Sequence, residues 1–130
     1  RIIHAGIMGA AVFALPPIVS MTTSDEIMSQ ITTFNTLWLI GLFFFGVHLI
    51  LLGRIVRHIR IIPIFLTLAG LMYILDTTAH ILLPNYDAYA SIFLALVAIP
   101  SIIGEMAFTI WLLIKGGTIA PTEERSPNTA

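Results

Sequence analysis

Long runs of apolar residues are the feature that most restricts the fold of this chain. A helix needs about 20 predominantly apolar residues to cross the hydrocarbon core of a bilayer, which is roughly 30 Å thick. Four segments meet this requirement, at residues 2–21, 34–56, 63–83 and 88–114. Because lipid offers no hydrogen bonds to an exposed backbone, segments of this kind cross a membrane as helices. The sequence therefore predicts an all-α integral membrane protein.

The composition and the short connections extend this prediction. Of the 130 residues, 58% are hydrophobic and only 10% are charged, whereas soluble domains carry about 25% charged residues. Short connections make sequential helices antiparallel neighbours, so we expect an up-down bundle of four transmembrane helices within one domain, residues 1–115. Residues 116–130 have little to bury and are predicted to form a disordered cytoplasmic tail.

Prolines and one capping residue refine the helix ends. Pro16-Pro17 should kink or end the first helix, because proline lacks the backbone N–H that a helix interior requires. Ser24 is a candidate N-cap that would start the second helix before its apolar span. Pro63 occupies the tolerated first position of the third helix. Pro100 lies inside the fourth, where neighbouring membrane helices can satisfy the backbone.

Two interpretations of the first span are open. Arg1 followed by an apolar run resembles a secretory signal. Gly6, Ala10 and Ala14 instead follow the small-xxx-small spacing that lets membrane helices approach closely, which favours a packed helix. The chain does not begin with methionine, which indicates a processed or incomplete chain.

The charged residues predict an orientation. In an up-down bundle all Lys and Arg fall on one side: Arg1, Arg54, Arg57, Arg60, Lys115 and Arg125. The opposite side carries Asp25, Glu26 and Asp87. This asymmetry follows the positive-inside rule, so we expect both termini in the cytoplasm. Arg54, Arg57 and Arg60 are interpreted as topology signals, with recognition of anionic lipid headgroups as the alternative, because such sites usually gather 4 to 8 basic residues. No basic face suggests nucleic acid as a partner.

Several stretches together resemble a bacterial family of multi-helix membrane proteins, domain of unknown function 4386. They are FFFGVHLILLG (43–53), LAGLMYILD (68–76), LPNY (83–86) and GEMAFTIWLLIKG (104–116), within a similarity that covers roughly residues 37–116. The resemblance implies a multi-helix fold in the bacterial inner (plasma) membrane and brings no established activity. Family members usually carry additional N-terminal helices, which leaves open whether helices precede Arg1.

Ionisable side chains inside the apolar spans are the candidate functional residues: His48, Asp76, His80 and Glu105, with His4 near the start of the first span. A charge at the bilayer centre costs at least about 2.5 to 3.5 kcal/mol, so these side chains should face the bundle interior. Read as a ladder, they form a path for protons or cations. Read as structural groups, Asp76 and His80 hydrogen-bond each other while Glu105 bonds His48 or Tyr73.

The sequence gives little support for a bound cofactor or for an enzyme activity. Asp76, His80 and Glu105 are weak candidates for metal ligands, because paired Glu-x-x-His motifs are missing. Haem would need two histidines at matched depth, for which His4 with His48 is the nearest pair. No cofactor is therefore predicted, and the lack of hydrolase, metalloprotease and phosphate-loop motifs makes an enzyme the less favoured class.

The sequence thus favours a structural or accessory membrane subunit that packs in the bilayer against copies of itself or a larger complex. The alternative is a proton- or cation-handling channel or transporter that uses the buried acids and histidines.

Overall fold

The computed structural model describes residues 2–116 and is built from helices. The predicted tail beyond Gly116, and the terminal residues Arg1 and Arg125, lie outside the described residues. The elements are α1 (Ile2–Phe13), η1 (Pro16–Ser20), α2 (Ser24–Ile55), α3 (Ile62–Leu82), η2 (Tyr86–Ala88) and α4 (Ala90–Gly116). Four segments are long and apolar enough to cross a membrane: Ile2–Ser20, Ser24–Ile55, Ile62–Leu82 and Ala90–Lys115. The predicted all-α fold with four candidate transmembrane segments is confirmed.

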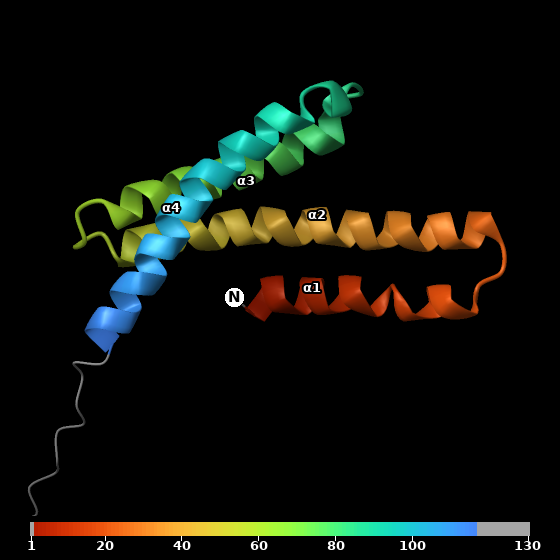
Figure 1. Ribbon diagram of the computed structural model, residues 1–130, viewed down its shortest axis with the longest axis horizontal. Helices are drawn as coiled ribbons and strands as arrows, with labels where there is room; N and C mark the ends of the chain where they lie inside the picture. The colour runs from red at the N-terminus through yellow and green to blue at the C-terminus, as the bar shows by residue number, and fades with distance from the viewer. Residues whose placement is uncertain (1, 117–130) are drawn as a thin grey trace, which may run out of the picture.

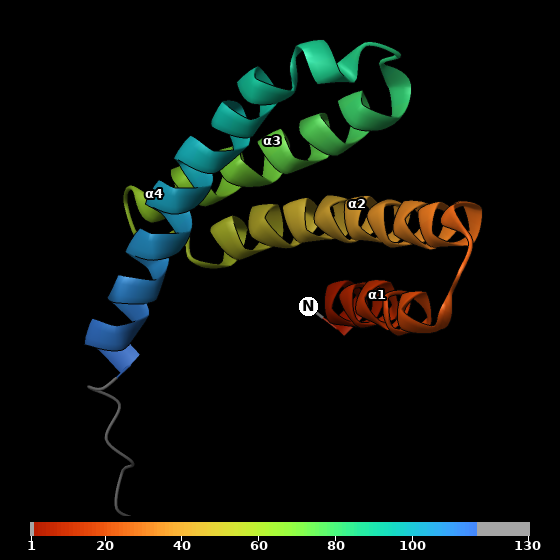
Figure 2. The ribbon, with the colours of Figure 1, turned by 45° about the vertical axis from the view of Figure 1, so that its right-hand side comes forward.

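The helices pack in the order of the chain, each antiparallel to the one before it (Figure 1). α1 lies along one side of α2, α3 lies along the other side, and α4 packs on α3. In both views α2 and α3 meet near the loop that joins them and diverge toward their other ends (Figure 2). The up-down arrangement is therefore an open row, with α1 and α4 at its two edges.

The first span is interrupted just before Pro16 and Pro17, as predicted from the sequence. α1 ends at Phe13, and a 3-10 helix begins at Pro16. Backbone bonds from Ala14 to Ala11 and from Leu15 to Val12 close the turn between them. Since neither proline can donate a backbone hydrogen bond, the α-helical ladder stops before them.

α2 is longer than its apolar span. Its 32 residues extend over about 48 Å, well beyond a hydrocarbon core of about 30 Å. The N-cap is Thr23 and not Ser24, so the predicted cap was wrong by one residue; the Thr23 hydroxyl bonds the Glu26 carboxylate and not the helix backbone. Hydroxyls in the next turns donate to carbonyls one turn earlier, as Thr32, Thr33 and Thr36 do. The hydroxyls in the first turns of α2 thus find hydrogen-bond acceptors within the helix itself.

The core is closest where glycines let backbones meet. A Cβ atom built on Gly46 of α2 would lie 2.6 Å from the carbonyl oxygen of Gly70 on α3, and one built on Gly70 would clash with the carbonyl oxygen of Gly46. Gly104 of α4 lies against the backbone of Phe65 in the same way. Beside this contact Leu66 of α3 is completely buried. Small residues at helix crossings are how membrane helices gain close packing.

The small residues of the first span behave differently from the prediction. A Cβ atom on Gly6 would meet nothing within 4 Å, and Ala10 is exposed. The contact with α2 is made instead by His4, Ile7 and Met8, which lie against Gly41, while Ala11 is completely buried. The expectation that Gly6 and Ala10 pack a helix is therefore wrong for contacts within this chain, because α2 covers the adjacent face of α1.

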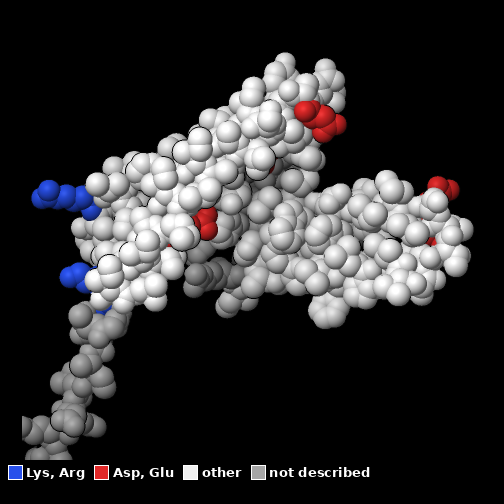
Figure 3. All heavy atoms as spheres, viewed as in Figure 1, with Lys and Arg blue, Asp and Glu red and all other residues white. Residues whose placement is uncertain are grey.

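The outer surface is apolar and its charges are segregated. Large hydrophobic side chains are exposed along every span, as Ile64 on α3 and Leu94 on α4 are, which suits contact with a lipid bilayer. Lys and Arg gather at the end of the molecule that holds the α2–α3 loop, and Asp and Glu lie mainly at the opposite end (Figure 3).

Candidate functional site

Asp76, Tyr86 and His80 form a polar cluster where α3 ends. The Tyr86 hydroxyl donates a hydrogen bond of 2.6 Å to a carboxylate oxygen of Asp76. The His80 ring lies 4.3 Å from the Tyr86 ring, centroid to centroid, and Phe93 of α4 stacks on Tyr86 from 5.5 Å. The short helix η2 turns Tyr86 back over the last turns of α3, which brings these groups together.

The cluster holds Tyr86 in its neutral form. Partial burial of the phenol, its hydrogen bond to Asp76, and the negative charges of Asp76 and Asp87 together raise the pKa of Tyr86 to about 12. Sequence reasoning missed Tyr86, although the Leu-Pro-Asn-Tyr turn directly after α3 was a visible signal. The predicted direct hydrogen bond between Asp76 and His80 is wrong, because Asp76 bonds Tyr86 instead.

His4 and His48 lie together between α1 and α2. The Nδ1 atom of His4 is 2.9 Å from the carbonyl oxygen of Gly41 and donates to it in the tautomer protonated at Nδ1. The Phe45 ring is near both, with its centroid 5.0 Å from that of the His4 ring and 6.3 Å from that of the His48 ring. A cavity of about 460 Å³ is lined by both histidines and by Phe45. His4 therefore joins α1 to the backbone of α2.

Glu105 lies apart from these groups, half-buried in the middle of α4. Ser101, one helical turn earlier, is near enough to interact with its carboxyl, but the Ser101 hydroxyl makes no hydrogen bond of normal geometry. The bond predicted from Glu105 to His48 or Tyr73 stays a prediction; the hydrogen bond described at this residue joins its backbone carbonyl to the Thr109 hydroxyl. The Thr77 hydroxyl of α3 is also buried without a partner among the described residues.

The weak metal candidates do not converge. Within residues 2–116, no group of three His, Asp or Glu side chains is arranged to hold a metal ion. Asp76 and His80 lie at the end of α3, and Glu105 lies mid-way along α4.

The loop arginines occupy two kinds of position. Arg54, at the end of α2, and Arg57, in the loop that follows, line a cavity that continues along α3, whereas Arg60 does not line it; all three side chains are exposed. His58, between them, packs against Trp111 of α4 with ring centroids 6.0 Å apart.

A family model described as "Domain of unknown function (DUF4386)" matches residues 1–116, which is most of the chain. The chain belongs to the DUF4386 family. This match includes the first span, beyond the stretch from about residue 37 in which the resemblance was noted, so the first helix is part of the DUF4386 domain.

A relative of this DUF4386 protein is known by sequence from the archaeon Archaeoglobus fulgidus. That protein, described as uncharacterized, is 31% identical over 97 residues, which are 73% of this chain and 56% of the relative. The chain thus spans about half the length of the curated relative that it matches. No solved structure matches the chain.

Proposed function

We propose that this protein is a structural or accessory subunit that packs in the membrane against copies of itself or a larger complex. Glu105 is the observation that carries this proposal. Gly104, the residue before it, packs against the backbone of Phe65 and Leu66, about one turn into α3, so Glu105 lies within the membrane-spanning part of the helices, on the side of the α2–α3 loop. A partly exposed carboxyl at that depth is costly against lipid, whereas a polar group on a neighbouring helix would satisfy it.

The two edges of the helix row support the same proposal. α1 packs on α2 and leaves Gly6 and Ala10 exposed on its outer face. Small residues of this kind allow another helix to approach closely. α4, at the other edge, presents Glu105. Both edges therefore offer features by which membrane helices associate.

The substitution Glu105→Leu tests the proposal against its matched control Glu105→Gln. Gln keeps the shape and the hydrogen-bonding capacity of a protonated Glu, so the Gln variant should retain the native assembly. Leu removes the polar group and should dissociate the assembly, measured as apparent mass by native electrophoresis after gentle extraction. An assembly that is unchanged in the Leu variant would contradict the role given to Glu105.

The second candidate function is a proton- or cation-handling channel or transporter that uses His48, Asp76, His80 and Glu105. The contact of Asp76 and His80 with Tyr86 favours it, since an acid, a phenol and an imidazole then meet at one end of the spans. Under this function Glu105→Gln abolishes pH-coupled flux in reconstituted vesicles. Flux that survives the substitution excludes this path.

We further propose that the protein lies in the plasma membrane of a prokaryote, with both termini in the cytoplasm. The sequence predicts the bacterial inner membrane. The gathering of Lys and Arg at the end with the α2–α3 loop supports this orientation through the positive-inside rule. A C-terminal reporter that is active only when cytoplasmic tests this orientation, and an inactive reporter on a fully inserted protein would contradict it.

A further inference from the structure

A cavity joins the arginines of the α2–α3 end to the apolar surface of α3. Its volume is about 570 Å³, and it is lined at one end by Arg54 and Arg57 and along its length by Ile64, Leu68 and Leu71. Ile64, Leu68 and Leu71 are 64%, 41% and 50% exposed, so the cavity opens to the outside of the helix row. Cationic side chains thus stand directly above an apolar groove.

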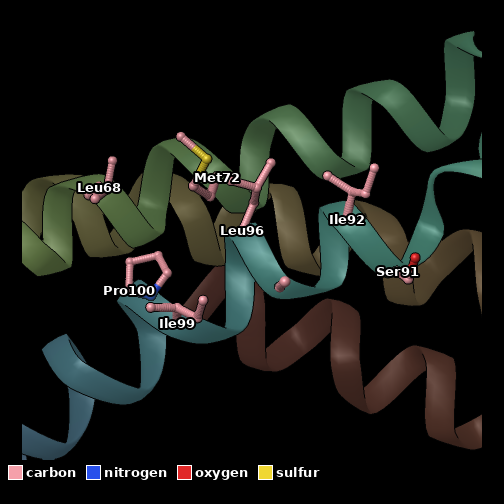
Figure 4. A pocket seen from close by; sticks show the side chains of 8 residues that line it. Leu68, Met72, Ser91, Ile92, Leu96, Ile99 and Pro100 are labelled. Carbon is pink, nitrogen blue, oxygen red and sulfur yellow. The ribbon is translucent and has the colours of Figure 1, made fainter.

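A second cavity continues this groove between α3 and α4. It has a volume of about 540 Å³, shares Leu68 with the first, and is lined by Met72 of α3 and by Ile92, Leu96 and Pro100 of α4. Figure 4 shows these side chains along the two neighbouring helices, with Leu68 and Met72 on α3 and the others on α4. Leu68 therefore forms a ridge with an apolar groove on each side.

We propose that these cavities bind one anionic glycerophospholipid, with its phosphate on Arg54 and Arg57 and its acyl chains along the grooves beside Leu68. The guanidinium fork matches a phosphate in charge and geometry. The α3 part of the first groove, from Pro63 to Leu71, is about 12 Å long, close to the roughly 15 Å depth of one leaflet's hydrocarbon. The first groove, which begins at the arginines, therefore matches one acyl chain of such a lipid.

Whether an arginine lines the cavity distinguishes lipid binding from a role in membrane topology alone. A topology signal depends on the number of basic residues near the span and not on their contacts. Arg54 and Arg57 line the cavity, whereas Arg60 of the same loop does not. Arg57 and Arg60 therefore form a matched pair, because each carries one charge in the same loop and only Arg57 lies at the cavity. This site does not depend on the proposed assembly.

The experiment measures phosphatidylglycerol that stays bound to the protein. The full chain is placed in nanodiscs of mixed phosphatidylcholine and phosphatidylglycerol, purified again in mild detergent, and its retained lipid quantified by mass spectrometry. One charge-assisted hydrogen bond between a guanidinium and a phosphate changes binding by about tenfold, so Arg57→Gln should lower retained phosphatidylglycerol by about that factor. Arg60→Gln should leave it nearly unchanged, and equal losses in both variants would overturn the site.

A second variant keeps every charge and therefore the topology. Leu68→Trp places a larger side chain on the exposed ridge between the grooves, and it should lower retained phosphatidylglycerol at least as much as Arg57→Gln does. Retention that is unaffected by Leu68→Trp would contradict binding of the acyl chains. Inorganic phosphate added in excess should not displace the lipid; displacement would show a simple anion site at the loop and overturn the proposal.

Discussion

The Tyr86 hydroxyl donates a 2.6 Å hydrogen bond to the Asp76 carboxylate, ten residues earlier in the chain. This bond ties the turn after α3 to the last turns of that helix, and the stacked ring of Phe93 continues the contact into α4. The antiparallel pair α3–α4 is thus held together at the end where α3 diverges from α2.

Replacing Tyr86 by Phe should destabilise the α3–α4 turn. The substitution keeps the ring against His80 and Phe93 and removes the bond to a charged acceptor, which is worth about 1.5 kcal/mol at a partly exposed site. Equilibrium unfolding in detergent micelles measures the change. Tyr89→Phe is the control, since Tyr89 is 53% exposed, and an equal loss in both variants would contradict the importance of the bond to Asp76.

The same contact predicts a pH dependence at the alkaline end. The pKa of Tyr86 is raised from 10.0 to about 12, so the folded state favours the neutral phenol. Its contribution to stability should be complete below pH 10 and lost as the pH rises toward 12. An absorbance titration of phenolate should show a late transition near pH 12 that Tyr86→Phe removes. A Tyr86 that ionises near pH 10 would contradict the described environment.

The contact between Gly46 and Gly70 should tolerate no larger side chain. Gly46→Ala places a methyl group against the carbonyl oxygen of Gly70. Overpacking of this kind costs about 1 to 3 kcal/mol, more than the gain in helix propensity of up to about 1 kcal/mol. A Cβ atom on Gly9 would meet nothing within 4 Å, so Gly9→Ala should be neutral or slightly stabilising. Thermal unfolding in detergent compares the two, and equal stability of the variants would contradict the packing of α2 on α3.

The number and order of the spans were predictable because they depend on hydropathy, a property of each segment by itself. Hydropathy alone placed the start of the second span at residue 34, whereas the capping signal at Ser24 predicted the earlier start of α2 to within one residue. Hydropathy indicates which residues lie in lipid. A helix can continue past this apolar stretch through polar residues whose hydroxyls bond the helix backbone, as the Thr32 hydroxyl bonds the Met28 carbonyl.

Pairings between helices were less predictable, because they depend on how helices rotate and on turns. The spacing of Asp76 and His80 favoured a bond between them, but the turn at η2 supplies Tyr86 as a nearer partner. Gly46 and Gly70 carry no sequence signal that one faces the other. His4 was singled out, yet its partner is a backbone carbonyl of Gly41, which side-chain patterns do not reveal.

His4→Phe should loosen α1 from α2. The ring contact with Phe45 remains, and the hydrogen bond to the Gly41 carbonyl, worth about 0.5 to 1.5 kcal/mol, is lost. We expect faster amide hydrogen exchange in α1, by about twofold to tenfold if α1 opens locally. His58→Phe, at the far end of α2, should leave α1 unchanged. Unaltered exchange of α1 in His4→Phe would show that other contacts hold this helix.

The central claim is that this chain works as one component of a membrane assembly, and native mass spectrometry of the protein released gently from its own membrane tests it most directly. We predict masses that contain further protein subunits, either copies of this chain or other membrane proteins. A spectrum that shows only the single chain, with lipid but no additional subunit, would contradict the claim.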